Sequence, residues 1–212
     1  PQYERDLDSV VAVPAAKLYF GFSEPWWEMI GLHEGRSVTD LPIRQCLYFG
    51  VEGEQAGADP HNTTSLLVAS YSDGNATRYW ETRIGEPPYY QTMAGLPPEL
   101  AVSAAVVEDV RGQLSEVHGT EIPAPKWAAF MDWTLDPYGG GWHYWRTGHR
   151  SVDVVPRMRR PFGDARVYVC GESFSSHQGW ILGALSSAER VLQDQFGAGH
   201  PDWLTPGADL GA

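Results

Sequence analysis

The stretch RVYVCGESFSSHQGWILGAL, Arg166–Leu185, determines how the last third of this chain is expected to fold. Alternating apolar residues over Arg166–Cys170 predict a buried strand, and Gly171-Glu172 predicts a tight turn directly after it. A polar, serine-rich loop follows. Apolar residues at helical spacing then predict an amphipathic helix over residues 179–196, before a further glycine. The stretch therefore predicts a strand, a turn and a helix in succession.

This succession has the chemistry of a ligand site. The N-terminus of a helix exposes unpaired backbone N–H groups and a partial positive charge. It therefore favours an anion or an electron-rich ring atom. Gly171 lets the backbone approach a ligand closely, and Glu172 can accept hydrogen bonds from ligand hydroxyls.

Composition excludes several classes of partner. The 212 residues are 42% hydrophobic and 20% charged, which is typical of a globular protein, and the net charge is −12. So acidic a chain is expected to bind neither nucleic acid nor an anionic membrane surface. Cys46 and Cys170 lie in apolar runs, so both are expected to be buried, and no spacing suggests a metal site. The basic run Arg157–Arg160 is either a partner-facing patch or a solvated loop, and we favour the loop.

Strand-like and helix-like segments follow one another without a regular alternation. The pattern predicts strands within residues 9–23 (interrupted at Pro14), 44–50, 65–70 and 122–133, and helices after Pro25 and within residues 75–84 and 97–117. We therefore expect an α+β fold and not a regular βαβ series.

A second informative run is DWTLDPYGGGWHYW, residues 132–145. Three consecutive glycines permit either a close approach of the backbone to a ligand or a plain turn. The aromatic residues Trp142, Tyr144 and Trp145 come directly after them, which favours the first interpretation.

Both runs resemble segments of the flavin amine oxidases, the group that contains monoamine oxidases and L-amino-acid oxidases. The C-terminal run is similar to that family's flavin-contacting motif, and the glycine-rich run to the segment that passes the flavin ring. AAKLYFGFSEPWWE, Ala15–Glu28, also resembles the family, and GRSVTDLPIRQCLYFG, Gly35–Gly50, resembles bacterial L-amino-acid oxidases most. The resemblance extends from about residue 9 to residue 196.

The resemblance implies an FAD cofactor and assigns residues to it. Gly141 stands where some members carry a cysteine linked to flavin, so FAD is expected to be non-covalent. Trp142 and Trp180 match two aromatics that form a slot for the substrate amine, with Tyr144 beside them. The positions expected to contact the cofactor are Gly140, Gly141, Gly171, Glu172, Ser173, Gly179, Trp180, Ile181 and Ala184.

Two parts of the family pattern are not found in this sequence. No GxGxxG precedes a helix, so the pyrophosphate site of FAD is expected on an N-terminal segment or subunit. The family's lysine, which holds water at the reactive flavin nitrogen, is expected there too. Neither Lys17 nor Lys126 is assigned to that role, and no catalytic residue is assigned. The chain is therefore interpreted as a fragment or a processed subunit that works within a hetero-oligomer.

The resulting prediction is the C-terminal part of an FAD-dependent L-amino-acid oxidase. Its substrates would be an L-amino acid and O₂, and its products a 2-oxo acid, ammonia and H₂O₂. A decarboxylating amino-acid monooxygenase, an amine or polyamine oxidase and a non-catalytic flavin-fold subunit stay open as alternatives. Residues 1–135 would form mainly a substrate-binding domain with a mixed or antiparallel sheet. Residues 136–196 would supply the closing strand and helix of the FAD-binding domain, and residues 197–212 an extended tail. The protein is expected to be soluble, either bacterial cytoplasmic or secreted.

Overall fold

The structure, a computed structural model, describes residues 1–81, 85–135, 137 and 140–199. It divides into a central unit, residues 14–140, and a terminal unit, which joins residues 1–13 to the chain from residue 141 onward. Both units combine helices with antiparallel strands, so the predicted α+β class is confirmed. Each unit is described by itself.

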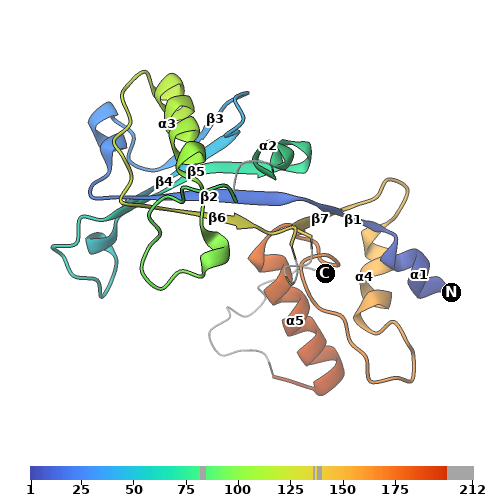
Figure 1. Cartoon of the computed structure of the whole chain (residues 1–212). Coiled ribbons are helices and arrows are strands. Elements are labelled where there is room, and N and C mark those ends of the chain that lie inside the picture. The colour runs from blue at the N-terminus through green and yellow to red at the C-terminus, as the bar shows by residue number, and fades with distance from the viewer. Residues whose placement is uncertain (82–84, 136, 138–139, 200–212) are drawn as a thin grey trace. The chain divides into compact units, whose positions relative to one another are not determined.

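The central unit is built on a five-stranded antiparallel sheet (Figure 1). Its strands lie in the order β3 (Gly35–Val38), β4 (Gln45–Val51), β5 (Ser65–Asp73), β2 (Ala15–Phe22) and β6 (Trp127–Asp132). In the centre, Leu18 of β2 lies opposite Ser70 of β5 and Phe130 of β6. Alternate residues of β2 point to opposite faces of the sheet, so Leu18 and Phe20 enter the core while Lys17 and Tyr19 face the other way.

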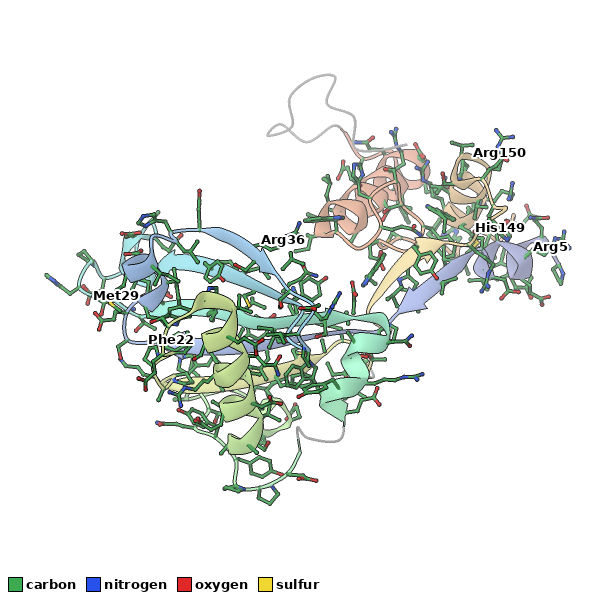
Figure 2. The ribbon with its side chains drawn as sticks, turned by 90° about the horizontal axis from the view of Figure 1, so that it is seen from above. Arg5, Phe22, Met29, Arg36, His149 and Arg150 are labelled. Carbon is green, nitrogen blue, oxygen red and sulfur yellow. The ribbon has the colours of Figure 1, made fainter. Side chains whose placement is uncertain are left out.

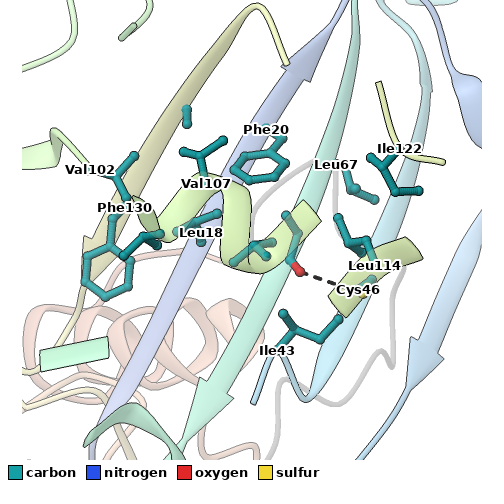
Figure 3. Close-up of a cluster of buried hydrophobic side chains, with 14 of the residues drawn as sticks. Leu18, Phe20, Ile43, Cys46, Leu67, Val102, Val107, Leu114, Ile122 and Phe130 are labelled. Atoms are coloured by element: carbon teal, nitrogen blue, oxygen red, sulfur yellow. Dashed lines mark hydrogen bonds between the residues drawn. The ribbon is translucent and has the colours of Figure 1, made fainter. Parts of the chain in front are cut away.

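Helix α3 (Ala104–His118) covers the core face of this sheet. The Ser103 side chain accepts a hydrogen bond from the Val106 N–H at the start of the helix, and Gly119 ends it in the left-handed conformation. Apolar side chains of the helix pack on the strands, as Figure 3 shows for Val107 and Leu114 against Leu18, Phe20 and Leu67. Cys46 is buried here as predicted, and its burial raises the pKa of the thiol to about 12.

Short helical turns make up the remaining described elements of the central unit. They are η1 (Trp26–Ile30), η2 (Glu52–Glu54), η3 (Gly74–Thr77), α2 (Arg78–Glu81) and η4 (Pro98–Leu100). The helix predicted over 97–117 therefore starts late, because Pro97 and Pro98 hold a 3-10 turn and Ser103 provides the cap. The helix predicted over 75–84 is confirmed as far as Glu81, and residues 82–84 lie outside the described residues.

The terminal unit joins the two ends of the chain. Its elements are α1 (Gln2–Leu7), β1 (Val10–Val13), β7 (Trp142–Trp145), α4 (Ser151–Arg159) and α5 (Ile181–Phe196). Strands β1 and β7 pair antiparallel, with Val11 opposite Tyr144. In addition, Arg157 of α4 donates two hydrogen bonds of 2.7 Å to the buried carboxylate of Asp6 in α1.

Three local predictions for this unit are wrong. Residues 166–170 form no strand, since none of the described strands lies beside them, and Cys170 is exposed where burial was predicted. The basic run is not a solvated loop: Arg157 and Arg159 lie in α4, and Arg159 Nη1 lies 3.7 Å from the Asp194 carboxylate. In addition, no strand was predicted after the three glycines, yet Trp142–Trp145 form β7, because pairing with β1 holds these residues in a strand.

The boundaries of the two units also differ from the domain boundaries that the sequence indicated. The first 13 residues group with the C-terminal segment through β1–β7 pairing and the Asp6–Arg157 contact, and the boundaries between the units fall after Val13 and after Gly140 in the chain. The functional names given to residues 1–135 and 136–196 stay predictions. Of the predicted extended tail, residues 200–212 lie outside the described residues.

Candidate functional site

The carboxylate of Glu172 is the centre of a hydrogen-bonded cluster in the terminal unit. Its Oε1 bonds to Nδ1 of His143, which β7 supplies. Its Oε2 accepts a hydrogen bond of 2.6 Å from the backbone N–H of Gly179, just before α5. The Ser173 hydroxyl lies 3.2 Å from the same His143 nitrogen. A residue of β7 and the turn that precedes α5 thus converge on one carboxylate, which is about one-fifth exposed.

The turn at Gly171 is tied to α5 by a serine. The Ser187 hydroxyl lies 2.8 Å from the Gly171 nitrogen and 2.9 Å from its carbonyl oxygen. Gly171 has a φ of 147°, which a side chain would strain, and a methyl group placed there would meet nothing within 4 Å. The backbone at this turn is therefore open for the close approach of a ligand.

The predicted aromatic slot is only partly assembled within the terminal unit. Trp142 lies beside Gly179, since a methyl group at Gly179 would be 3.4 Å from its Cε3 atom. Its ring also contacts Tyr144, with centroids 6.0 Å apart. Trp180 is 73% exposed, and among the described residues no ring contact joins it to Trp142. The structure thus brings Trp142 and Tyr144 together and leaves Trp180 facing outward.

The remaining predicted cofactor positions lie at two places in the described backbone. Gly140 and Gly141 have φ values of 94° and 101°, which confirm that glycines are needed there. Ile181 opens α5 and is 78% exposed, and Ala184 follows one turn later. Trp180, the N-cap residue, makes no side-chain capping bond, and its carbonyl oxygen accepts from the Gly183 N–H, so in the first turn of α5 the N–H groups of Ile181 and Leu182 can meet a ligand.

Lys17 is a candidate that sequence reasoning left unassigned. It is half-buried on β2, and its Nζ lies 4.8 Å from the ring centre of Tyr71. Within the described residues no carboxylate lies within 4 Å of it, and burial lowers the pKa of its ammonium group. A lysine without a carboxylate partner is unusual inside an apolar strand. Its position within the apolar run AAKLYF could already be seen in the sequence.

A pocket of about 570 Å³ lies at the other end of β2, around η1. Phe22 and Met29, labelled in Figure 2, are among the residues that line it. Its rim includes Glu24, Glu28 and Glu121. None of the predicted site residues is among the described residues that line it, so it gives no support to the predicted site.

The Glu172 cluster has the features of a cofactor site: an open glycine turn, a carboxylate that can accept hydroxyl hydrogen bonds, and a helix N-terminus. Comparison with known families identifies the class. Residues 1–194 match the family described as flavin containing amine oxidoreductase. The chain belongs to this family, so its cofactor class is flavin.

Individual relatives agree with this assignment. Aplysianin-A of Aplysia kurodai is 32% identical over 191 residues, which are 86% of this chain and 33% of that protein. The flavin-dependent L-tryptophan oxidase RebO of Lentzea aerocolonigenes is 30% identical over 177 residues, 82% of this chain and 32% of the relative. L-amino-acid oxidase 4 of Hebeloma cylindrosporum is 27% identical over 192 residues, 84% of this chain and 28% of the relative. The chain thus spans about a third of the length of these proteins.

Two further features were searched for in the part of the chain that the structure describes. None of its helices is both long and apolar enough to cross a membrane. Within the same residues, no group of three or more His, Cys, Asp or Glu side chains is placed to hold a metal ion.

Proposed function

We propose that this chain is part of an FAD-dependent L-amino-acid oxidase. The observation that carries the proposal is the Glu172 cluster, found in a chain that belongs to the flavin amine oxidoreductase family. Relatives named L-amino-acid oxidase and L-tryptophan oxidase support an amino acid as substrate.

The terminal unit has groups that fit FAD. A carboxylate offers about four acceptor positions, and His143 and Gly179 use two of them. Those that remain on Glu172 can accept hydrogen bonds from cofactor hydroxyls. The first turn of α5 offers the backbone N–H groups of Ile181 and Leu182, the open Gly171 turn lets a ligand approach closely, and the Gly140-Gly141 backbone can pass close to a ring. With no cysteine at position 141, the bond to FAD would be non-covalent.

Lys17 is our candidate for the lysine that the family uses to hold a water molecule. The sequence interpretation placed that lysine on a preceding segment. A half-buried ammonium group without a carboxylate partner keeps its N–H donors available for water, and its lowered pKa eases the release of a proton. Lys17 would therefore bind and orient water in the finished site.

The reaction would oxidise the Cα–N bond of an L-amino acid to an imine. Bound flavin would supply the hydride acceptor for this oxidation and the route by which two electrons reach O₂ to give H₂O₂. Water then hydrolyses the imine to a 2-oxo acid and ammonia. Trp142, Tyr144 and Trp180 would orient the amine and exclude water from it. The pyrophosphate of FAD would be held by an N-terminal segment with GxGxxG, on the same polypeptide or on a partner in a hetero-oligomer.

The test is aerobic incubation of the full protein, with its N-terminal segment, with a panel of L-amino acids. We expect H₂O₂ and ammonia in equal amounts. An amide and CO₂ as products would assign the protein to the monooxygenases. Turnover of decarboxylated amines alone would assign it to the amine oxidases, and no turnover of either class by FAD-loaded protein would support a non-catalytic subunit.

A further inference from the structure

A cavity with two arginines lies within the terminal unit, lined by α4, α5 and the loop before α5. Its volume is about 330 Å³, and Arg159 of α4 and Arg190 of α5 are among the residues that line it. The rest of its described lining is uncharged: Ser151, Val152, Val155, Pro156 and Ser176. Within the described residues, no carboxylate therefore lines this cavity, although the chain has a net charge of −12.

Both guanidinium groups lack the partners that their burial requires. The Nε–H groups of Arg159 and Arg190 are buried, and neither makes a hydrogen bond within the described residues. Arg159 has one carboxylate near it, since its Nη1 lies 3.7 Å from Oδ2 of Asp194. For Arg190, no carboxylate among the described residues lies within 4 Å. A buried donor that loses water without gaining an acceptor destabilises a protein, and a charged donor does so more strongly.

The two cations also repel each other. Burial lowers the pKa of Arg159, the nearby charge of Arg190 lowers it further, and Asp194 opposes both effects. The Arg159 side chain is only 16% exposed, so water and salt screen this repulsion weakly. An anion in the cavity would replace the repulsion by attraction and would give both Nε–H groups an acceptor. The cavity thus has the charge and the donors of an anion site.

Two hydroxyl groups and an apolar wall indicate which kind of anion fits. Ser151 lies in the first turn of α4, and Ser176 brings a second hydroxyl from the loop before α5. Guanidinium groups bind the paired oxygens of phosphates and carboxylates through two parallel hydrogen bonds. Two guanidinium groups and two hydroxyls match the several oxygens and double charge of a phosphate better than a single carboxylate. Val152, Val155 and Pro156 add apolar surface for an organic group attached to it.

From these contacts we propose that the cavity binds a phosphate dianion, either inorganic phosphate or the phosphoryl group of a phosphate monoester. A cavity of about 150 Å³ is large enough for benzene, so this larger cavity holds a phosphate group with space beside it. Bound there, the anion would connect α4 to α5 and to the loop that carries Ser176. The inference does not depend on the oxidase function, and its test does not use peroxide release.

The test is isothermal titration calorimetry on the full, FAD-loaded protein at fixed ionic strength, with inorganic phosphate, glycerol 3-phosphate and acetate as probes. We expect one phosphate per chain with a Kd of about 1 mM or lower. Acetate should bind about tenfold or more weakly, because a monoanion with two oxygens uses fewer of the donors. Tighter binding of glycerol 3-phosphate than of inorganic phosphate would assign the cavity to a monoester, and the reverse order would assign it to free phosphate. Both orders support the proposal.

Two variants connect the binding to this cavity. Arg190→Gln should raise the Kd for phosphate by about tenfold or more, the effect of losing a hydrogen-bonded charged group. Val152→Glu should raise it by a similar factor, because the new carboxylate repels phosphate and competes for the arginines. Val152 is 67% exposed, so the fold tolerates this change. Val38→Glu, also at a position 67% exposed, adds the same charge on β3 of the central unit and should leave the Kd unchanged.

Several results would overturn the proposal. If the FAD-loaded protein shows no saturable phosphate binding, another part of the full protein fills the cavity. If phosphate binds only the apoprotein and FAD displaces it, the arginines belong to the phosphates of the cofactor. Acetate that binds as tightly as phosphate would contradict a site for a dianion. A Kd that Val152→Glu leaves unchanged, or that Val38→Glu raises equally, would place the phosphate elsewhere. Peroxide release from amino acids is a separate measurement, so a failure of the oxidase function would be recognised independently.

Discussion

Glu172 is the residue on which the candidate flavin site depends most directly. Its carboxylate already joins β7, the Gly171 turn and the start of α5, through His143 and Gly179. We propose a twofold role for it toward FAD: it would accept hydrogen bonds from cofactor hydroxyls, and it holds the surrounding backbone in place. These two roles respond differently to substitution.

Replacing Glu172 by Gln keeps the size of the side chain but removes its charge. Hydrogen bonds to a charged group contribute about 1.5–3 kcal/mol, so we expect the Kd for FAD to rise by roughly 10- to 150-fold. Flavin fluorescence during titration of the apoprotein measures this. Glu121→Gln, at an exposed position, is the matched control. An unchanged Kd in Glu172→Gln would assign the carboxylate a purely structural role.

Trp180 allows a sharp test of the aromatic slot because it is 73% exposed. Its replacement by Ala should therefore leave the fold intact, and a lower activity would report on ligand contact. We expect kcat/KM to fall by roughly 5- to 150-fold, the effect of losing about 1–3 kcal/mol of apolar contact in the transition state. Phe49→Ala, at a 45% exposed position on β4, should have little effect. Equal losses in the two variants would remove Trp180 from the site.

At the scale of elements, an ion pair joins α1 and α4. The half-exposed guanidinium of Arg157 in α4 contacts the buried carboxylate of Asp6 in α1. The hydrogen bonds from Arg157 lower the pKa of Asp6, although burial of the carboxyl opposes this. A carboxyl whose pKa is lower in the folded state stabilises the fold at neutral pH. That contribution is fully present above the pKa of the unfolded chain, about 3.9, and is lost as the pH falls through the folded value.

We therefore expect Asp6→Asn to unfold at lower urea concentration than the wild type at pH 7. The gap between the two midpoints should narrow as the pH falls below about 4 and close at the lower folded pKa of Asp6, where the wild-type carboxyl also becomes neutral. Asp153→Asn, which removes an exposed carboxylate near Arg150, should change the midpoint little at any pH. A gap that stays constant down to pH 2 would mean that the charge of Asp6 does not stabilise the fold.

The elements that the sequence predicted well are those with a strong local signal. Alternation over residues 9–23, interrupted at Pro14, predicted β1 and β2, and helical spacing closed by glycine predicted α3 and α5. The strand expected over Arg166–Cys170 failed because a strand needs a neighbour, and none of the described strands supplies one. Likewise β7 was missed because its four residues are held by β1, some 130 positions earlier in the chain.

In the candidate site, too, the residues with a strong local signal could be predicted, and those that depend on distant contacts could not. Gly171, Glu172 and Gly179 could be found from the local turn and helix signals. His143 could not be linked to Glu172 from sequence, because their contact depends on how β7 lies against the turn before α5. Lys17 was visible as a charge in an apolar strand, but only the structure shows that it has a ring beside it and no carboxylate within reach among the described residues.

At the scale of the whole molecule, the outstanding feature is apolar surface on α5. Ile181, Leu182, Leu185, Leu192 and Phe196 are each between 46% and 78% exposed. Contiguous apolar surface of this kind marks a place where another segment binds. The relatives are about three times as long as this chain, so we propose that a further segment, which would carry the GxGxxG expected of the family, covers this face and residues 166–170.

The last prediction follows from that surface. Residues 1–212 expressed alone should bind the dye ANS strongly and retain no FAD, since the pyrophosphate site would be missing. Co-expression with the N-terminal segment should lower ANS fluorescence and yield a complex with a flavin absorbance band, from which acid releases the FAD.

In the complex, Leu185→Glu on α5 should weaken assembly, because it places a charge in the apolar contact. Val152→Glu, at an exposed position on α4, adds the same charge outside it. Stoichiometric FAD on residues 1–212 alone would contradict the need for a second segment, and equal assembly of the two variants would place the contact elsewhere.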